Sequence, residues 1–239
     1  MSHRLIYIDG VGEILFKHSS RARHLGISVR PFLGARVSIP IGMSYNSAVR
    51  LVAEKKVWII QHLKKMREFE KQQTIFNEYS GYCTKHYKLE LRKSDRKNIS
   101  VRLSKGKINV TYPAELNTNT KEIQSAIRTG IERALKIEAK QYLPDKVKVL
   151  SAKFGFEYNK LTLKNIKSRW GSCSRNNNIN LSIHLMRLPE HLIDYVILHE
   201  LVHTVHHNHS ARFWSKLDEI KNGAKNLDKE LKKYRIAIY

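Results

Sequence analysis

The chain has 239 residues, 41% of them hydrophobic, so it is long enough to bury a core and too apolar for a disordered protein. Its 44 Lys and Arg outnumber its 21 Asp and Glu, and the formal net charge of +23 permits attraction to nucleic acid, to acidic membrane surfaces or to acidic proteins. The two cysteines, Cys83 and Cys173, lie far apart, which excludes a disulfide framework and favours a reducing compartment.

No segment of the sequence predicts export or a membrane span. The apolar run near the start, residues 5–8, is too short for the core of a signal peptide. No stretch of about 18 or more apolar residues occurs. We therefore expect a cytoplasmic protein with no membrane partner.

The first hundred or so residues predict short strands interrupted by one helix. Residues 27–30 and 36–39 alternate apolar and polar side chains on either side of a turn, which predicts a hairpin. A helix is expected to begin at Asn46 or Ser47 and to run to about Phe69, with a strongly basic outer face. Three further strands are expected at residues 87–91, 99–103 and 108–112.

The composition changes to helix-forming residues after Pro113. Residues 120–143 carry apolar side chains at helical intervals, and Pro144 is expected to end or restart this helix. Leu188-Pro189 introduces another helix, and the basic tail, residues 211–234, is expected to be helical. Strands are expected at residues 156–166 and 179–183, separated by a polar loop over residues 168–178.

These patterns predict an α+β protein with two parts. A boundary near residues 113–119 is expected to separate a basic, β-rich N-terminal part with one long helix from a helix-rich catalytic part with a small sheet. The two parts are residues 1–115 and residues 116–239.

The helix after Pro189 carries the run His199-Glu200-Leu201-Val202-His203. Two histidines one turn apart, about 6 Å along the helix axis, can both reach one metal ion. A carboxylate directly after the first histidine stands beside the attacking water in zinc peptidases, where it accepts the water's proton and passes it to the leaving amine. The run predicts a zinc-dependent hydrolase of peptide bonds, with one zinc ion per chain and Glu200 as the general base.

The alternative interpretation is a buried structural helix or an adventitious metal site. A core helix has no packing need for many histidines, and an adventitious site would not require Glu200. Five of the chain's twelve histidines lie within eleven residues: His199, His203, His206, His207 and His209. This density favours a metal site.

His209 is the expected third ligand. A straight helix would put His206 about 10.5 Å beyond His199, too far to share the ion. Asn208 tolerates the left-handed conformation that ends helices, so a turn there can swing His209 back to the metal. The spacing equals that of metzincin peptidases, but those have Gly at the position of His206, so we expect the chain to turn one or two residues later. Glu219 remains the alternative third ligand.

The polar loop contains a second candidate feature, Arg169 and Trp170. Arg169 is suited to bind a substrate carboxylate or to stabilise an oxyanion, and Trp170 to form a wall of the cleft. Alternatively, Trp170 lies in the core and Arg169 caps backbone carbonyls. The sequence leaves both interpretations open.

The combined motifs resemble those of the YgjP-like family of bacterial and archaeal zinc metallopeptidases, which is related to the SprT and WLM groups. The matching segments are residues 20–23, 27–29, 167–174, 179–181, 193–197, 199–203, 208–210 and 213–214. The resemblance implies a zincin-type catalytic domain in which His199, His203 and His209 bind zinc and Glu200 is the general base. The family often has an aromatic residue soon after the position of Leu181, and this chain has Ser182-Ile183-His184 there. The departure concerns the residues that line the pocket and not the metal ligands.

The substrate is expected to be a protein or peptide. The SprT and WLM relatives are linked to proteolysis of proteins crosslinked to DNA, and the basic surface makes non-specific nucleic acid a further candidate partner. Two other functions stay open: a nucleic-acid-binding protein with a structural zinc, or a zinc amidase acting on non-peptide substrates. No oligomeric state can be predicted.

Overall fold

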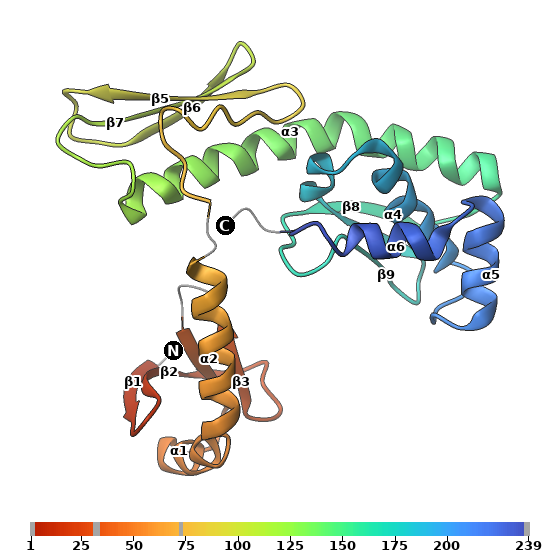
Figure 1. Ribbon diagram of the computed structural model, residues 1–239. Helices are drawn as coiled ribbons and strands as arrows, with labels where there is room; N and C mark the ends of the chain where they lie inside the picture. The colour runs from red at the N-terminus through yellow and green to blue at the C-terminus, as the bar shows by residue number, and fades with distance from the viewer. Residues whose placement is uncertain (1–2, 31–33, 72–73, 237–239) are drawn as a thin grey trace. The chain divides into compact units, whose positions relative to one another are not determined.

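The computed structural model describes residues 3–30, 34–71 and 74–236 (Figure 1). It combines helices with three small sheets, which confirms the predicted α+β class. The chain divides into two compact units, Met1–Thr74 and Ile75–Ile238, and each has its own buried core. The boundary expected near residues 113–119 falls inside the second unit, because the sheet that precedes it packs on the helix that follows it.

The first unit is a four-stranded sheet with two helices. The strand order is β1-β2-β4-β3, with β2 and β4 parallel and the other pairs antiparallel. The pairing of β3 with β4 confirms the predicted hairpin, whose turn at residues 31–33 lies outside the described residues. The elements are β1 (His3–Ile8), β2 (Gly12–Ser19), β3 (Gly26–Arg30), β4 (Gly34–Pro40), α1 (Tyr45–Glu54) and α2 (Lys56–Lys71).

The prediction of one long helix in this unit was wrong in two respects. The side chain of Ser44, and not Asn46 or Ser47, caps the first helix by accepting a hydrogen bond from the backbone N–H of Ser47 at 3.1 Å. The helix then breaks at Lys55, whose φ of −96° and ψ of 12° leave the helical region. The apolar period continues across this break, so the periodicity does not reveal it.

The second unit begins with a three-stranded sheet of order β5-β7-β6. These strands confirm the three that the sequence predicts before Pro113. They are β5 (Lys88–Ser94), β6 (Ser100–Ser104) and β7 (Lys107–Pro113). Helix α3 (Lys121–Phe154) crosses this sheet so closely that a Cβ added at Gly130 would lie 2.7 Å from Ile108 and 2.9 Å from Val101.

Helix α3 runs through Pro144 without ending, which corrects the expected helix boundary. A proline inside a helix costs about 3 kcal/mol because one backbone hydrogen bond is lost. Leu143 and Val147, on either side of Pro144, are both fully buried. The buried side chains along the whole length of α3, the long green helix of Figure 1, outweigh this cost.

A second three-stranded sheet has the order β8-β10-β9, with β8 parallel and β9 antiparallel to the central strand. Its strands are β8 (Lys160–Lys164), β9 (Gly171–Cys173) and β10 (Asn178–Ser182). Strand β9 lies inside the segment expected to be a loop. Its short Gly-Ser-Cys sequence has no apolar alternation, so its pairing with residues 179–181 depends on tertiary contacts.

The remaining elements surround this sheet, and α4 is their buried centre. Helix α4 contacts α3, β9, β10, α5 and α6, and most of its side chains are buried. The tail expected to be one helix is interrupted at residues 221–223, where Gly223 has a φ of 76° and Asp218 accepts a hydrogen bond from the Ala224 N–H. The elements are η1 (Ile183–Arg187), α4 (Glu190–Val202), α5 (Ala211–Ile220) and α6 (Ala224–Leu231).

Among the described residues, no helix combines the length and the apolar character that crossing a bilayer requires.

Candidate metal centre

The end of α4 presents two histidines to one side. His199 lies in the last turn, and His203 is the C-cap with a φ of −65° and a ψ of −15°. Their ring centroids are 4.9 Å apart. The four-residue step along the helix therefore places both imidazoles on the same face.

The chain leaves α4 at His203, earlier than expected. The N–H groups of Thr204 and His206 donate to the carbonyls of Leu201 and Val202 in tight turns. The His206 carbonyl then accepts a hydrogen bond from Nδ1 of His203 at 2.9 Å. Because Nδ1 carries the proton in this bond, Nε2 of His203 keeps its lone pair for a metal.

This turn returns His209 to the histidines of α4. Nε2 of His209 lies 3.0 Å from Nε2 of His199 and 3.2 Å from Nε2 of His203. One ligand atom from each of the three residues lies within 4.8 Å of the others. The expected left-handed turn at Asn208 was wrong, because Asn208 is not among the described residues with positive φ.

Glu219, the alternative third ligand, lies apart from this cluster. It is on α5, and both of its carboxylate oxygens bind Nζ of Lys216, at 3.0 and 3.2 Å. Among the described residues, the cluster that could hold a metal ion contains His209 and not Glu219.

Phe213 in the first turn of α5 supports all three imidazoles. Its fully buried ring has centroid distances of 4.9, 4.5 and 4.8 Å to His199, His203 and His209, respectively. Edge-on and tilted aromatic contacts at these distances restrict how the imidazoles can rotate. The sequence predicts Phe213 as a core anchor of this helix, which its burial confirms, whereas its contacts with the imidazoles are known only from the tertiary structure.

The partial burial of His199 and His203 favours their neutral forms. Burial lowers the pKa of His199 to about 3, and the neighbouring His203 and His209 lower it further. Burial also lowers the pKa of His203. A neutral imidazole has the free lone pair that a metal ion needs.

Glu200 lies on the neighbouring side of α4 against strand β9. A Cβ added at Gly171 would lie 2.6 Å from Oε1 and 2.7 Å from Cγ of Glu200. Glu200 is 6% exposed, and burial raises the pKa of its carboxyl group to about 8, while the charge of Arg169 opposes this rise. Its buried Oε2 has no hydrogen-bond partner among the described residues.

A cavity of about 470 Å³ opens beside His199, Glu200 and His209. Arg169 and Trp170 both line it, so the residues that the sequence singled out lie beside the histidines. Other lining residues come from α6 and the segment after it, including Asp228, Leu231, Lys232 and Tyr234.

Two polar residues of this cavity, Tyr195 and Asp228, were not among the site residues predicted from the sequence. Tyr195 lies one turn before His199, a spacing from which its position could have been predicted. Burial raises the pKa of its hydroxyl, and the carboxylate of Asp228 adds to this effect. Asp228 comes from α6, and no local pattern in the sequence indicates that it reaches the site.

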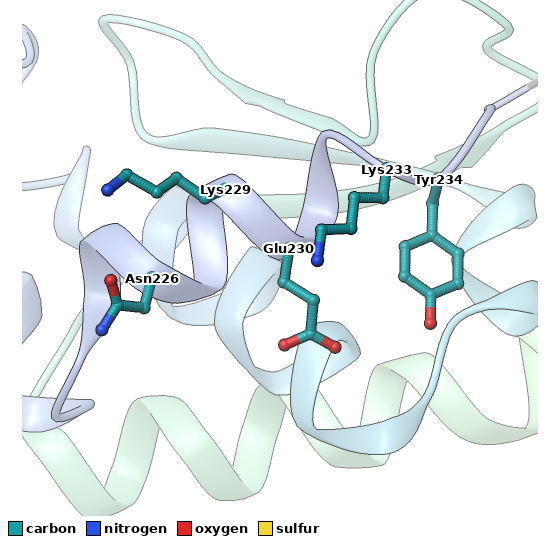
Figure 2. A pocket seen from close by; sticks show the side chains of 5 residues that line it. All are labelled: Asn226, Lys229, Glu230, Lys233 and Tyr234. Atoms are coloured by element: carbon teal, nitrogen blue, oxygen red, sulfur yellow. The ribbon is translucent and has the colours of Figure 1, made fainter.

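Figure 2 shows a different cavity, of about 600 Å³, on α6. Its labelled side chains come from α6 and the two residues that follow Lys232: Asn226, Lys229, Glu230, Lys233 and Tyr234. Glu230 is already bound to Nε2 of His191 at 2.8 Å. The histidine cluster lies in the other cavity, and we therefore locate the chemistry there.

Three imidazoles that converge beside a buried carboxylate are typical of metal-dependent hydrolases. Residues 23–234 match the model of the YgjP-like metallopeptidase domain, and the chain belongs to this family. The match confirms the resemblance noted in the sequence. The family implies a metal, and the three histidines could hold it.

Two solved structures of metallopeptidase zymogens are also similar to the chain. Abylysin from Pyrococcus abyssi is 23% identical, with a TM-score of 0.34, over 38% of this chain and 92% of that one. Jannalysin from Methanocaldococcus jannaschii is 24% identical, with a TM-score of 0.34, over 38% of this chain and 93% of that one. Comparison with curated proteins finds no match. The assignment to the family therefore rests on the family model.

Proposed function

We propose that the protein is a zinc-dependent metallopeptidase in which His199, His203 and His209 hold one zinc ion and Glu200 is the general base. The observation that carries the proposal is the convergence of three imidazole nitrogens within 4.8 Å beside a buried carboxylate. Membership of a metallopeptidase family supports it.

The donor set fits zinc. With Zn–N bonds of about 2.1 Å, tetrahedral coordination requires nitrogens about 3.4 Å apart. The separations of 3.0 and 3.2 Å from His209 to the other two Nε2 atoms are close to this requirement. Three protein ligands leave a fourth position open, as in catalytic sites, whereas structural zinc sites usually have four protein ligands.

Glu200 would move the protons of the reaction. A zinc ion supplies Lewis acidity, which polarises a peptide carbonyl and lowers the pKa of water to about 7. Oε2 of Glu200, which forms no hydrogen bond with any described residue, accepts the proton of the attacking water. Glu200 then donates this proton to the leaving nitrogen. A cation held by the histidines favours the ionised form of Glu200 and so opposes the effect of burial on its pKa.

An edge strand beside the site favours a peptide substrate over other amide substrates. Strand β9 is the outer strand of its sheet among the described strands, and its Gly171 touches Glu200. An edge strand has unpaired backbone groups that can bind an extended peptide as an additional strand. Such pairing would bring a peptide bond close to Glu200.

Peptide hydrolysis by zinc-loaded protein tests the proposal. Quenched fluorescent peptide libraries should be cleaved by the wild type, and Glu200→Gln should reduce kcat by about 10²-fold or more while keeping the zinc. A chelator should abolish the activity of the wild type, and added zinc should restore it. Cleavage by Glu200→Gln at the wild-type rate would contradict the role of Glu200, and cleavage of simple amides but no peptide would favour the amidase alternative.

A further inference from the structure

The cavity beside the histidines contains a cationic side chain that no described residue binds directly. Of its two cationic side chains outside the histidine cluster, Lys232 is neutralised by Asp228, with Nζ 2.6 Å from Oδ2. Arg169 forms no hydrogen bond or ion pair with any residue that the structure describes. A guanidinium group that lines a cleft without a hydrogen-bond or ion-pair partner is available to a ligand.

The loop that carries Arg169 is fixed at both ends. The side chain of Ser182 donates to the Ile166 carbonyl at 2.7 Å, and its backbone N–H donates to the Trp170 carbonyl at 2.8 Å. Ser182 is fully buried. Between these two points, Nζ of Lys167 lies 2.6 Å from Oε1 of Glu132. A loop held at three points limits the loss of conformational entropy when Arg169 binds a ligand.

Arg169 lies toward the open side of the cleft. Its side chain is exposed, whereas Glu200, on the same cavity, is buried. Trp170 and Leu231 supply apolar walls, which weaken screening by water. A substrate group would therefore meet Arg169 near the cleft mouth.

We propose that Arg169 binds a carboxylate of the substrate, so that the enzyme prefers peptides with an acidic side chain or a free C-terminus close to the scissile bond. This inference rests on the proposed peptidase function. The planar guanidinium group donates two parallel hydrogen bonds to a carboxylate, a geometry that Lys cannot reproduce. An oxyanion-stabilising role would instead act on all peptides alike.

Paired peptides test this preference. Each pair differs only by Glu or Gln at an internal position, or only by a free or amidated C-terminus, and the two pairs distinguish the two sources of the carboxylate. We expect kcat/KM of the wild type to favour at least one carboxylate-bearing peptide by about tenfold to a hundredfold, mainly through KM. Arg169→Gln should remove this preference, and Arg169→Lys should restore it only in part.

Charge reversal and a matched control complete the experiment. Arg169→Glu should shift the preference to peptides with Lys at the same position. Arg175→Gln, which removes an exposed arginine outside the cavity, should keep the wild-type preference. Zinc content and melting temperature should be unchanged in all variants, which excludes misfolding as the cause.

Two outcomes would overturn the inference: equal kcat/KM for all peptide pairs, or a uniform fall of kcat in Arg169→Gln on every peptide. Binding of the same fluorescent peptides to zinc-loaded Glu200→Gln, measured by anisotropy, separates this failure from failure of the proposed function. If the wild type hydrolyses no peptide but Glu200→Gln binds the carboxylate-bearing peptides more tightly through Arg169, the peptidase proposal fails and carboxylate recognition is supported. If neither pair differs in binding, the inference fails whatever the activity.

Discussion

Gly171 and Glu200 meet so closely that a side chain at position 171 would displace Glu200. The contact involves Cγ and Cδ of Glu200 as well as its terminal oxygen, so a rotation of the carboxylate alone would not relieve an added methyl group. The glycine thus determines where the carboxylate lies relative to the histidines. This contact explains why a Gly follows Arg169 and Trp170 in a segment that looks like an ordinary polar loop.

Gly171→Ala should therefore impair activity without loss of metal. The methyl group would displace Glu200, and we expect kcat to fall by about 10²-fold, with the free energy of unfolding reduced by about 1–3 kcal/mol. Zinc content, kcat and thermal melting measure the three quantities. Gly26→Ala is the matched control, because its nearest neighbour, Cβ of Ser38, is 4.0 Å away. Full activity of Gly171→Ala would contradict the positioning role.

The elements that form the site differ in how well the sequence predicts them. Helix α4 could be predicted, because its apolar residues have a helical period and its two histidines share that period. Strand β9 could not, since three residues without alternation become a strand only when β10 lies beside them. The return of His209 was predicted, but its cause was not: the helix ends at Val202, and the His206 carbonyl orients His203.

Helix η1 contains a buried titratable residue, His184, that was not predicted from the sequence. The imidazole of His184 is fully buried, and its Nε2 donates to Oδ1 of Asn165 at 2.8 Å. Burial lowers its pKa to about 4, and the nearby Arg187 lowers it further. No pattern in the sequence distinguishes His184 from the exposed histidines.

This pKa predicts a pH dependence of stability. An unfolded histidine has a pKa of about 6.5, so between pH 6.5 and 4 the unfolded chain binds more protons than the folded one, and stability falls as the pH falls. His184→Gln lacks this titration. In urea unfolding at several pH values, the stability advantage of the wild type over His184→Gln should shrink by up to about 3 kcal/mol from pH 7 to pH 4. A difference that stays constant with pH would contradict the prediction.

At the scale of the whole molecule, positive charge is present in both units. The first 74 residues alone contain 13 Lys and Arg against 5 Asp and Glu. On α2, the side chains of Lys64, Lys65 and Arg67 are exposed. Association with nucleic acid stays a prediction from this charge, and it would concern phosphates rather than bases.

Salt dependence tests whether this charge binds nucleic acid. The affinity for duplex DNA of random sequence should fall steeply between about 50 and 200 mM salt, with a slope of about −0.9 for each phosphate contact. The triple substitution of Lys64, Lys65 and Arg67 by Gln should weaken binding and reduce that slope by about 2–3 if these residues contact phosphates. Fluorescence anisotropy measures both. Absence of binding at about 50 mM salt would remove nucleic acid from the candidate partners.

The zinc content of purified protein variants, measured by elemental analysis, tests the central claim most directly. We predict one zinc per chain in the wild type and in Glu200→Gln, and loss of zinc in His209→Ala. His206→Ala and Glu219→Ala should retain it, because the first residue contributes only its carbonyl and the second is bound to a lysine. Folded wild-type protein that fails to retain zinc after the metal is supplied would contradict the account, as would His209→Ala that retains it fully.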